Sequence, residues 1–166
     1  MIVVVMGVSG SGKTTLGAEL AARLGCDFLD GDDYHPAENV AKMAAGTPLE
    51  DADRWPWLAR LNALLREAQA ADGSAVLACS ALKATYRERL AEGLSDCRWV
   101  YLDAAPQVLR ERLAARRHRY MPASLLESQL ATLEAPAGAL RIDVGAPVDA
   151  CLAKMLAALA SPRLLQ

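Results

Sequence analysis

A phosphate-binding loop lies at the start of the chain. Residues 7–14 read Gly-Val-Ser-Gly-Ser-Gly-Lys-Thr, the spacing G-x-x-x-x-G-K-[ST], and they follow directly on the apolar run 2–6. In such loops consecutive backbone N–H groups surround a polyphosphate, and the next helix points the positive end of its dipole at the same anion. The motif predicts that Lys13 reaches the β- and γ-phosphates and that the Thr14 hydroxyl ligates Mg²⁺. The alternative, a Gly-rich turn without a ligand, does not explain the strand and helix patterns on either side.

The composition is typical of a small enzyme rather than of a general binder of nucleic acid or membrane surfaces. The chain has 166 residues, of which 53% are hydrophobic and 23% charged, and its formal net charge is −2. This length and composition allow one domain with a full core. The apolar runs are too short for a transmembrane helix or a signal peptide, so we predict a cytoplasmic protein. The four cysteines form no C-x-x-C pair, and we expect reduced, mostly buried thiols.

Apolar runs alternate with segments of helical period along the chain, which predicts parallel βαβ units. The expected strands are 2–6, 27–30, 75–79, 99–102 and 140–143. Helical spacing recurs in three apolar sets: Leu16, Leu20 and Leu24; Leu58, Leu61 and Leu65; and Val148, Leu152, Met155 and Leu159. In an open parallel sheet, ligands bind outside the carboxyl ends of the strands. The residues that follow each strand are therefore the candidates for a functional site.

Two carboxylates follow the second expected strand. Asp30 and Asp32 flank Gly31, which permits a close backbone turn, while Asp33 is expected to be solvated. In a phosphoryl transferase, one such carboxylate can lie near the metal and the other near the acceptor hydroxyl. An Asx-type turn would use the same residues structurally. The phosphate loop favours the interpretation as an active site.

Cations follow in two segments that could meet an anionic acceptor. Lys83 and Arg87, after the third expected strand, are four residues apart and so share one face of a helix. Two neighbouring cations are ordinarily a solvated surface, but the carboxyl end of a strand suits an anionic acceptor. Arg54 stands beside two tryptophans, and stacking in the core is the simpler interpretation of that residue alone.

A cluster of arginines predicts a lid near residues 112–130. The segment 110–120 contains five arginines and one acid. Part of this charge belongs on a solvated helix face. Phosphoryl transfer spreads negative charge over the transferring oxygens, and a cationic lid supplies counter-charge and shuts out water. Arg112 and Arg116 are four residues apart and could reach the phosphates together, with Arg116 the first candidate for the lid arginine.

These motifs together resemble the gluconokinases of the small P-loop type, which are relatives of shikimate and adenylate kinases. The resemblance spans nearly the whole chain and is carried by GVSGSGKT at 7–14, DGD-x-x-HP at 30–36, N-x-x-KM-x-x-G-x-PL at 39–49, D-x-DR-x-PWL at 51–58, CSALK-x-x-YR at 79–87 and SQ-x-x-TLE at 128–134. It implies a three-layer α/β P-loop kinase fold with a five-stranded parallel sheet in a single domain, 1–166. It also implies ATP-dependent phosphorylation of D-gluconate to 6-phospho-D-gluconate with Mg²⁺, and commonly a homodimer.

The resemblance also implies roles for individual residues. The ATP-binding residues would be Gly7, Ser9, Gly10, Ser11, Gly12, Lys13, Thr14, Thr15, Arg112 and Arg116. The catalytic residues would be Lys13, Asp32 and Arg116. Asp32 would be the base at the terminal hydroxyl of gluconate and Asp30 would support the metal ion through water, although the two acids could be exchanged. Gluconate would be bound by Asp32, His35, Arg54, Lys83 and Arg87, with the cations on its carboxylate.

Two segments leave the interpretation open. Many gluconokinases read Gly-His-Phe in the lid where this chain reads His118-Arg119-Tyr120, which puts the flexibility of the lid in question. The segment 143–147 could cup the adenine or form a plain turn before the last helix, and its residues suit both.

Two other functions are compatible with the phosphate loop. One is a different small-molecule kinase, of the shikimate or nucleoside type. The other is a nucleotide-dependent switch, which would need neither an acid pair nor a cation pair at the ends of the strands.

Overall fold

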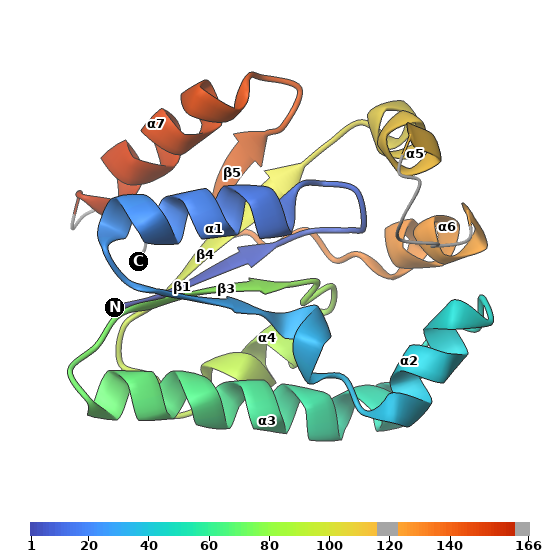
Figure 1. Cartoon of the computed structure of the whole chain (residues 1–166), viewed down its shortest axis with the longest axis horizontal. Helices are drawn as coiled ribbons and strands as arrows, with labels where there is room; N and C mark the ends of the chain where they lie inside the picture. Colours follow the sequence, from blue (N-terminus) through green and yellow to red (C-terminus); the bar gives the residue numbers. More distant parts are fainter. Residues whose placement is uncertain (116–122, 162–166) are drawn as a thin grey trace.

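The computed structural model describes residues 1–115 and 123–161 (Figure 1). Within these residues, five parallel strands form one sheet in the order β2-β3-β1-β4-β5. The strands are β1 (Ile2–Met6), β2 (Asp27–Asp30), β3 (Ala75–Cys79), β4 (Cys97–Asp103) and β5 (Leu140–Asp143). The predicted α/β fold with a five-stranded parallel sheet is confirmed.

The strand β4 is longer than the predicted 99–102. It begins at Cys97 and ends at Asp103, and its first residues pair with the start of β1. Arg98 interrupts the apolar pattern there, so the pattern understates the strand. The guanidinium of Arg98 donates a hydrogen bond of 2.6 Å to the carbonyl of Leu159 and is thereby accommodated at the edge of the core.

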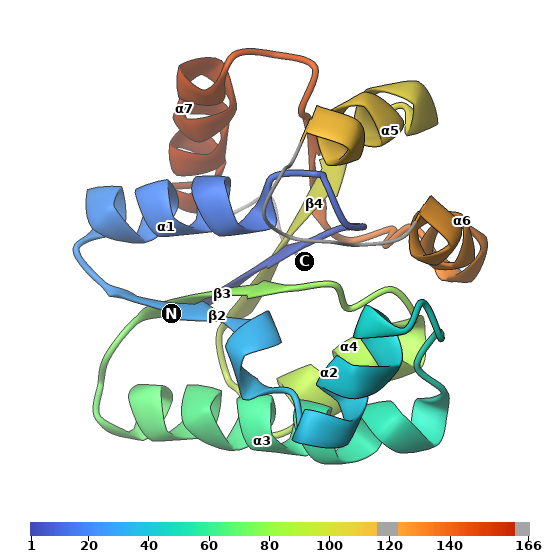
Figure 2. The same cartoon turned by 45° about the vertical axis from the view of Figure 1, so that its right-hand side comes forward.

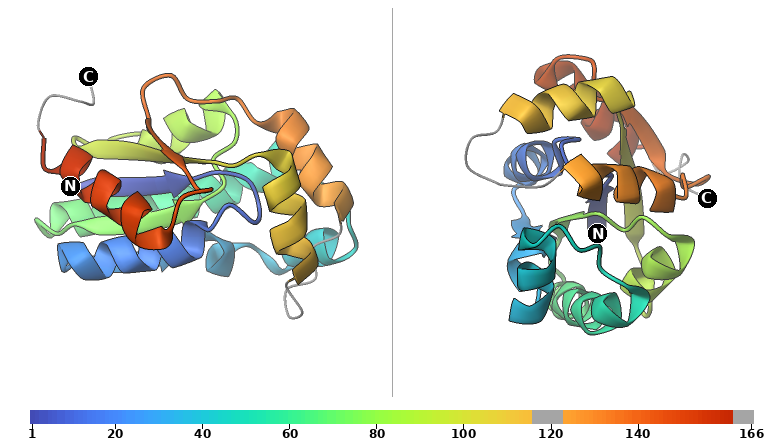
Figure 3. Two further views of the ribbon diagram at one scale, coloured as in Figure 1. Left: turned by 90° about the horizontal axis from the view of Figure 1, so that it is seen from above. Right: turned by 90° about the vertical axis from the view of Figure 1, so that its right-hand side faces the viewer.

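Helices cover both faces of the sheet. They are α1 (Lys13–Leu24), the short 3-10 helix η1 (Gly31–Tyr34), α2 (Ala37–Ala44), α3 (Asp51–Ala70), α4 (Ala84–Ala91), α5 (Pro106–Ala115), α6 (Ala123–Thr132) and α7 (Val148–Leu159). The helices α1 and α7 lie on one face and α3 and α4 on the other (Figures 1 and 2). The helices α2, α5 and α6 gather around the carboxyl end of the sheet (Figure 3). The architecture therefore has the three predicted layers.

The central strand β1 is buried on both faces, which explains why its sequence is a continuous apolar run. Successive side chains of a strand point to opposite faces. Ile2, Val4 and Met6 belong to the core shared with α3 and α4, whereas Val3 and Val5 belong to the core shared with α1 and α7. The phosphate loop thus begins from the most rigidly packed strand of the sheet.

A third, smaller core lies at the carboxyl end of the sheet. It joins Val8 of the phosphate loop, Leu82 of the β3–α4 connection, Leu109 of α5 and Leu126 of α6. Each of these four side chains is at most 4% exposed. This cluster holds α5 and α6 against the phosphate loop, on the side of the sheet where a ligand is expected.

The last helix spans the four apolar residues that share its predicted face, but they are not equally buried. Leu152, Met155 and Leu159 are buried, whereas Val148 is 47% exposed. Val148 is the first residue of α7, and it lines an open cavity beside the phosphate loop rather than the core. The helical spacing is correct, but the first turn of α7 extends past the layer that would cover it.

The burial of the four cysteines agrees with the expectation from the sequence. Cys79 and Cys151 are buried, Cys26 and Cys97 are partly buried, and all four are free. Across residues 1–115 and 123–161, no helix has both the length and the apolar character needed to cross a membrane.

Packing at Gly31 predicts a large effect of a small substitution. A Cβ at this position would lie 2.8 Å from the carbonyl oxygen of Ala78 in β3, and backbone cannot move aside cheaply. We expect Gly31→Ala to lower the free energy of unfolding by about 1–3 kcal/mol, as overpacking does. Urea denaturation measures this.

The matched control is Gly138→Ala, because no atom lies within 4 Å of the Cβ at that glycine. Its free energy of unfolding should stay within about 0.5 kcal/mol of the starting value. Equal losses in the two variants would contradict the packing argument.

Candidate active site

The phosphate loop leaves the N-terminus of α1 open to an anion. The N-cap residue is Gly12, whose φ of 97° lies in the left-handed region, and no side chain caps the helix. The first N–H groups of a helix lack partners within the helix and carry the positive end of its dipole. The geometry that the sequence motif predicts is therefore present, and it suits a phosphate group.

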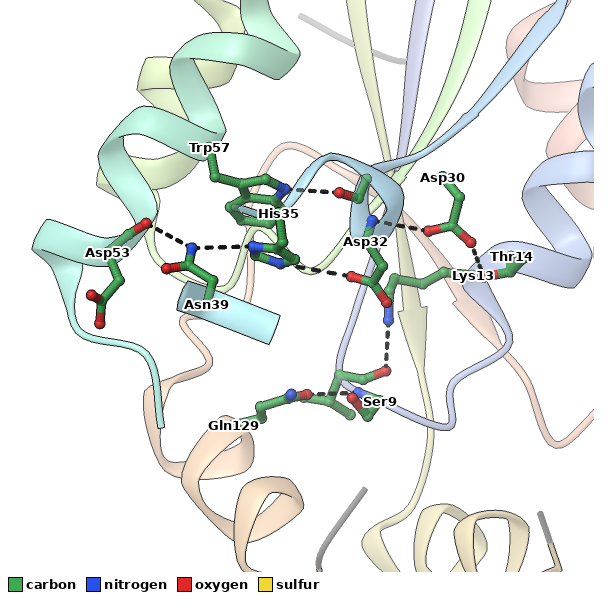
Figure 4. A network of polar contacts seen from close by, with 12 residues as sticks. Ser9, Lys13, Thr14, Asp30, Asp32, His35, Asn39, Asp53, Trp57 and Gln129 are labelled. Atoms are coloured by element: carbon green, nitrogen blue, oxygen red, sulfur yellow. Dashed lines mark hydrogen bonds and ion pairs between the residues drawn. The ribbon is translucent and has the colours of Figure 1, made fainter. Parts of the chain in front are cut away.

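The side chains that follow the loop connect it to the end of β2 (Figure 4). The Thr14 hydroxyl donates a hydrogen bond of 2.8 Å to Oδ2 of Asp30, and the other oxygen of Asp30 accepts one of 3.1 Å from the backbone N–H of Asp32. The ammonium group of Lys13 donates to the carbonyl of Val8 at 3.1 Å. The acid pair and the phosphate loop are consequently one structural unit.

Thr14 and Asp30 fit the magnesium role that the sequence suggests. A hydroxyl can offer a lone pair to a metal ion while it donates its proton to a carboxylate. Mg²⁺ is usually held by few protein oxygens and keeps several waters, which a neighbouring carboxylate can bind. The contact between these two residues is compatible with direct ligation by Thr14 and water-mediated support by Asp30.

A small cavity brings the predicted acceptor residues together. It is lined by Ser9, Lys13, Asp32, His35, Met43, Pro48, Leu49, Arg54, Ser80, Leu125, Ser128 and Gln129. The lining comes from the phosphate loop, η1, the segment around α2, α3, the end of β3 and α6. Oε1 of Gln129 accepts a hydrogen bond of 2.7 Å from the N–H of Ser9, which ties α6 to the loop. The site is thus enclosed by elements that are far apart in the sequence.

Arg54 is the guanidinium that faces this cavity. Its Nε is buried and has no hydrogen-bond partner among the described residues. Its guanidinium carbon lies 5.3 Å from the centroid of the Tyr86 ring, so the stacking that the sequence allowed is also present. A buried donor without a partner is costly. An anionic ligand in the cavity would remove that cost.

Lys83 and Arg87 lie outside this lining. Lys83 donates a hydrogen bond of 2.8 Å to Asp51, and this bond and one from Tyr86 lower the pKa of Asp51. Arg87 donates to the carbonyls of Ala81 and Leu82 at 3.0 and 3.2 Å. Lys83 is the N-cap residue of α4, so the bonds of these two cations stabilise the start of that helix in this structure.

A second cavity of about 200 Å³ lies on the other side of the phosphate loop. It is lined by Gly10, Ser11, Gly12, Thr15, Leu16, Arg112, Val144, Ala146, Val148 and Cys151. Arg112 donates a hydrogen bond of 2.6 Å to the carbonyl of Val144, which joins α5 to the loop after β5. The N–H of Gly145 donates to Oδ1 of Asp143 at 2.8 Å. The segment 143–147 is therefore a turn and also a wall of this cavity.

The predicted residues divide between the two cavities as follows. Gly10, Ser11, Gly12, Thr15 and Arg112 line the larger cavity, and Ser9, Lys13, Asp32, His35 and Arg54 line the smaller one. Gly7 and Thr14 line neither: Gly7 lies where the loop leaves β1, and Thr14 contacts Asp30. Arg116 and residues 118–120 lie outside the described residues.

Sequence reasoning assigned no role to several residues of the smaller cavity. Ser80 directly follows β3, so the rule about strand ends could have found it. Ser128 and Gln129 begin the motif SQ-x-x-TLE, which marked the family without indicating their place. Met43 and Leu49 carry no chemical signal that distinguishes them from core residues.

Comparison with known proteins places the chain among kinases. The family model described as "AAA domain" matches residues 2–136. A gluconokinase of Gluconobacter oxydans is 54% identical over 133 residues, covering 80% of this chain and 75% of that protein. A probable gluconokinase of Xenopus tropicalis is 43% identical and covers 93% of this chain and 91% of its own. The crystal structure of a gluconokinase from Sinorhizobium meliloti superposes with a TM-score of 0.86 at 44% identity, covering 95% of this chain and 90% of the other.

The larger cavity predicts a selective defect in nucleotide binding. Ala146 lines that cavity and is exposed, so a larger side chain there fills the cavity without entering the core. We expect Ala146→Phe to weaken ATP binding about tenfold or more, because a loss of 1.4 kcal/mol is already tenfold. Isothermal titration calorimetry with ATP measures this.

Ala150→Phe is the matched control, because Ala150 lies in the first turn of α7 and is also exposed but does not line the cavity. Its ATP affinity should be unchanged. If both variants lost affinity for ATP equally, or if neither lost any, the nucleotide would have to bind elsewhere.

Proposed function

The chain belongs to the gluconokinase family of P-loop kinases, and on that premise we propose that it transfers the γ-phosphoryl group of ATP to D-gluconate. The products are ADP and 6-phospho-D-gluconate. The observation that carries the proposal is a single cavity in which the loop lysine, Lys13, faces the carboxylate of Asp32 and the guanidinium of Arg54. A phosphoryl donor, a base and an anchor for an acidic acceptor are needed together for this reaction.

The nucleotide is assigned to the larger cavity and to the loop between the cavities. Backbone N–H groups from Gly10 to Thr15 bind the phosphates, and Lys13 extends toward the smaller cavity, where the γ-phosphate meets the acceptor. Thr14 would ligate Mg²⁺ and Asp30 would support it through water, and the ion would supply positive charge that stabilises the phosphates. The turn 143–147 forms the wall for the adenine.

Asp32 is the base of the transfer. It accepts the proton of the terminal hydroxyl of gluconate as that oxygen forms a bond to the γ-phosphorus. The bond between the γ-phosphorus and the β–γ bridging oxygen breaks, and ADP leaves with the electron pair. Asp30 is less suited to this role, because both of its oxygens already accept hydrogen bonds from Thr14 and from the N–H of Asp32.

Arg54 holds the carboxylate of gluconate and so orders a flexible acceptor from its far end. Its buried Nε has no partner among the described residues, whereas Lys83 and Arg87 both have protein partners. A direct contact of Lys83 or Arg87 with gluconate remains the prediction from the sequence. Beside their bonds to Asp51 and to the carbonyls of Ala81 and Leu82, the ammonium of Lys83 and the guanidinium of Arg87 each have further N–H donors for such a contact.

The remaining assignments rest on the sequence. The short apolar runs predict a cytoplasmic location, the arginine cluster predicts a lid near 112–130 that brings Arg116 to the phosphates, and the family resemblance implies a homodimer. The described parts of that lid are the end of α5 and helix α6, and α6 contacts the phosphate loop through Gln129.

The two acids should differ sharply under substitution. We expect Asp32→Asn to lower kcat by about 10²- to 10⁴-fold with little change in ATP binding, because a positioned base contributes about that much. Asp30→Asn should instead raise the Mg²⁺ concentration needed for half-maximal rate. Steady-state kinetics with gluconate, ATP and varied Mg²⁺ measure both, and the reverse pattern would exchange the two roles. Lys13→Ala serves as the reference, because loss of the lysine that stabilises the transition state should abolish turnover.

The experiment that tests the function is ADP release with a panel of acceptors. Gluconate should support the fastest turnover, ahead of shikimate, other sugar acids, nucleoside monophosphates and a neutral polyol of the same length. In Arg54→Ala the KM for gluconate should rise about ten- to a hundredfold with the KM for ATP unchanged, since a hydrogen bond to a charged group contributes about 1.5–3 kcal/mol.

Two comparisons make this panel decisive. The neutral polyol should lose little further in Arg54→Ala, because it has no carboxylate to lose. Lys83→Ala and Arg87→Ala should raise the KM for gluconate less than Arg54→Ala does. A larger effect at Lys83 than at Arg54 would place the carboxylate at Lys83, and faster turnover of another acceptor would replace gluconate as the substrate.

A further inference from the structure

The His35 ring is held in a fixed plane at the edge of the acceptor cavity. It stacks on Trp57 with ring centroids 4.1 Å apart and an angle of 15° between the planes. Trp57 is itself fixed, because its Nε1–H donates a hydrogen bond of 2.8 Å to the carbonyl of Gly31. The side chain of His35 is only 3% exposed. A ring so enclosed is poorly placed to bind a sugar acid directly, but it is well placed to orient a neighbouring side chain.

The buried side chain of Asn39 determines which nitrogen of His35 carries the proton. Nδ2 of Asn39 lies 2.9 Å from the carbonyl oxygen of Asp53 and 3.3 Å from Nδ1 of His35. A carbonyl can only accept, so the atom between these two groups is the amide nitrogen and not the amide oxygen. Its two protons point to two acceptors. Nδ1 is then the acceptor, and the proton of the neutral ring is on Nε2.

The protonated nitrogen faces the acid pair. Nε2 of His35 lies 4.0 Å from Oδ1 of Asp32. This separation exceeds a direct hydrogen bond, so the contact is electrostatic in this structure. The side chain of Asp32 is 51% exposed and has room to turn toward the ring. Lys13 and Arg54 are the other charged groups that line this part of the cavity.

We propose that His35 is a positioning residue: its neutral, Nε2-protonated ring orients the carboxylate of Asp32 toward the acceptor hydroxyl, and Asn39 selects that tautomer. The role of Asp32 as base comes from the proposed function, and this inference depends on it. The position of the proton does not, because it follows from Asn39 and Asp53 alone. Burial lowers the pKa of His35, which favours the neutral ring, while Asp32 opposes and Arg54 reinforces that effect.

The tautomer can be measured without any activity. The full chain, labelled with ¹⁵N-histidine, contains two histidines, and a His118→Gln variant assigns their signals. At neutral pH we expect Nδ1 of His35 to be unprotonated and Nε2 to carry the proton. In Asn39→Asp, a carboxylate replaces the amide donor and the proton should appear on Nδ1. A proton on Nδ1 of the unsubstituted protein would overturn the inference.

Two substitutions at His35 separate the donor from the ring. His35→Phe keeps a ring that can stack on Trp57 but has no donor, whereas His35→Gln keeps an N–H donor of similar reach but has no ring. We expect His35→Phe to lower kcat with gluconate about tenfold or more at an unchanged KM for ATP, because the carboxylate of Asp32 loses the N–H that orients it. His35→Gln should recover most of the rate.

Other outcomes would contradict the inference. Greater damage in His35→Gln than in His35→Phe would make the ring a packing element. A raised KM for gluconate at constant kcat in both variants would make His35 a direct substrate ligand, as the sequence predicted. If the unsubstituted protein does not turn over gluconate, the proposed function fails, and the histidine spectra still decide whether Asn39 sets the proton.

Discussion

The site depends on how tightly the end of β2 packs against β3. Asp30 pairs with Ala78 in the parallel register, and the next residue, Gly31, is so close to the Ala78 carbonyl that a Cβ would collide with it. The indole N–H of Trp57 holds Gly31 from the side of α3. The chain must therefore turn immediately after Asp30. That turn places Asp32 beside the phosphate loop and leaves Asp30 against Thr14.

Two carboxylates two residues apart acquire different roles from their surroundings. Asp30 accepts one hydrogen bond at each oxygen, so its carboxylate is held beside Thr14 at the start of α1. The side chain of Asp32 is half-exposed and faces His35 and the acceptor cavity. Because their environments differ in this way, two acids of one site can serve different purposes, one in proton transfer and the other in holding neighbouring groups.

The parts of this arrangement that follow local sequence rules were predictable. The loop at 7–14 and the strands depend on neighbouring residues, and four of the five strands have the predicted bounds, whereas β4 begins earlier and ends later than predicted. The exposure of Val148 was harder to predict, because helical spacing gives the face of a residue but not whether another layer covers it. The partner of Lys83 was also hard to predict, because the spacing of Lys83 and Arg87 does not show which acid either one meets. Asn39 contacts Asp53 across 14 residues, and no pattern in the sequence encodes that bond.

We propose above all that the phosphate loop, the acid pair and Arg54 form a single site for ATP and gluconate. A crystal structure with a non-hydrolysable ATP analogue, Mg²⁺ and gluconate tests it most directly. We predict the γ-phosphate at Lys13, the gluconate carboxylate on Arg54, and the terminal hydroxyl of gluconate within hydrogen-bond distance of Asp32. Gluconate bound away from this cavity, or with its terminal hydroxyl at Asp30 instead of Asp32, would contradict the account.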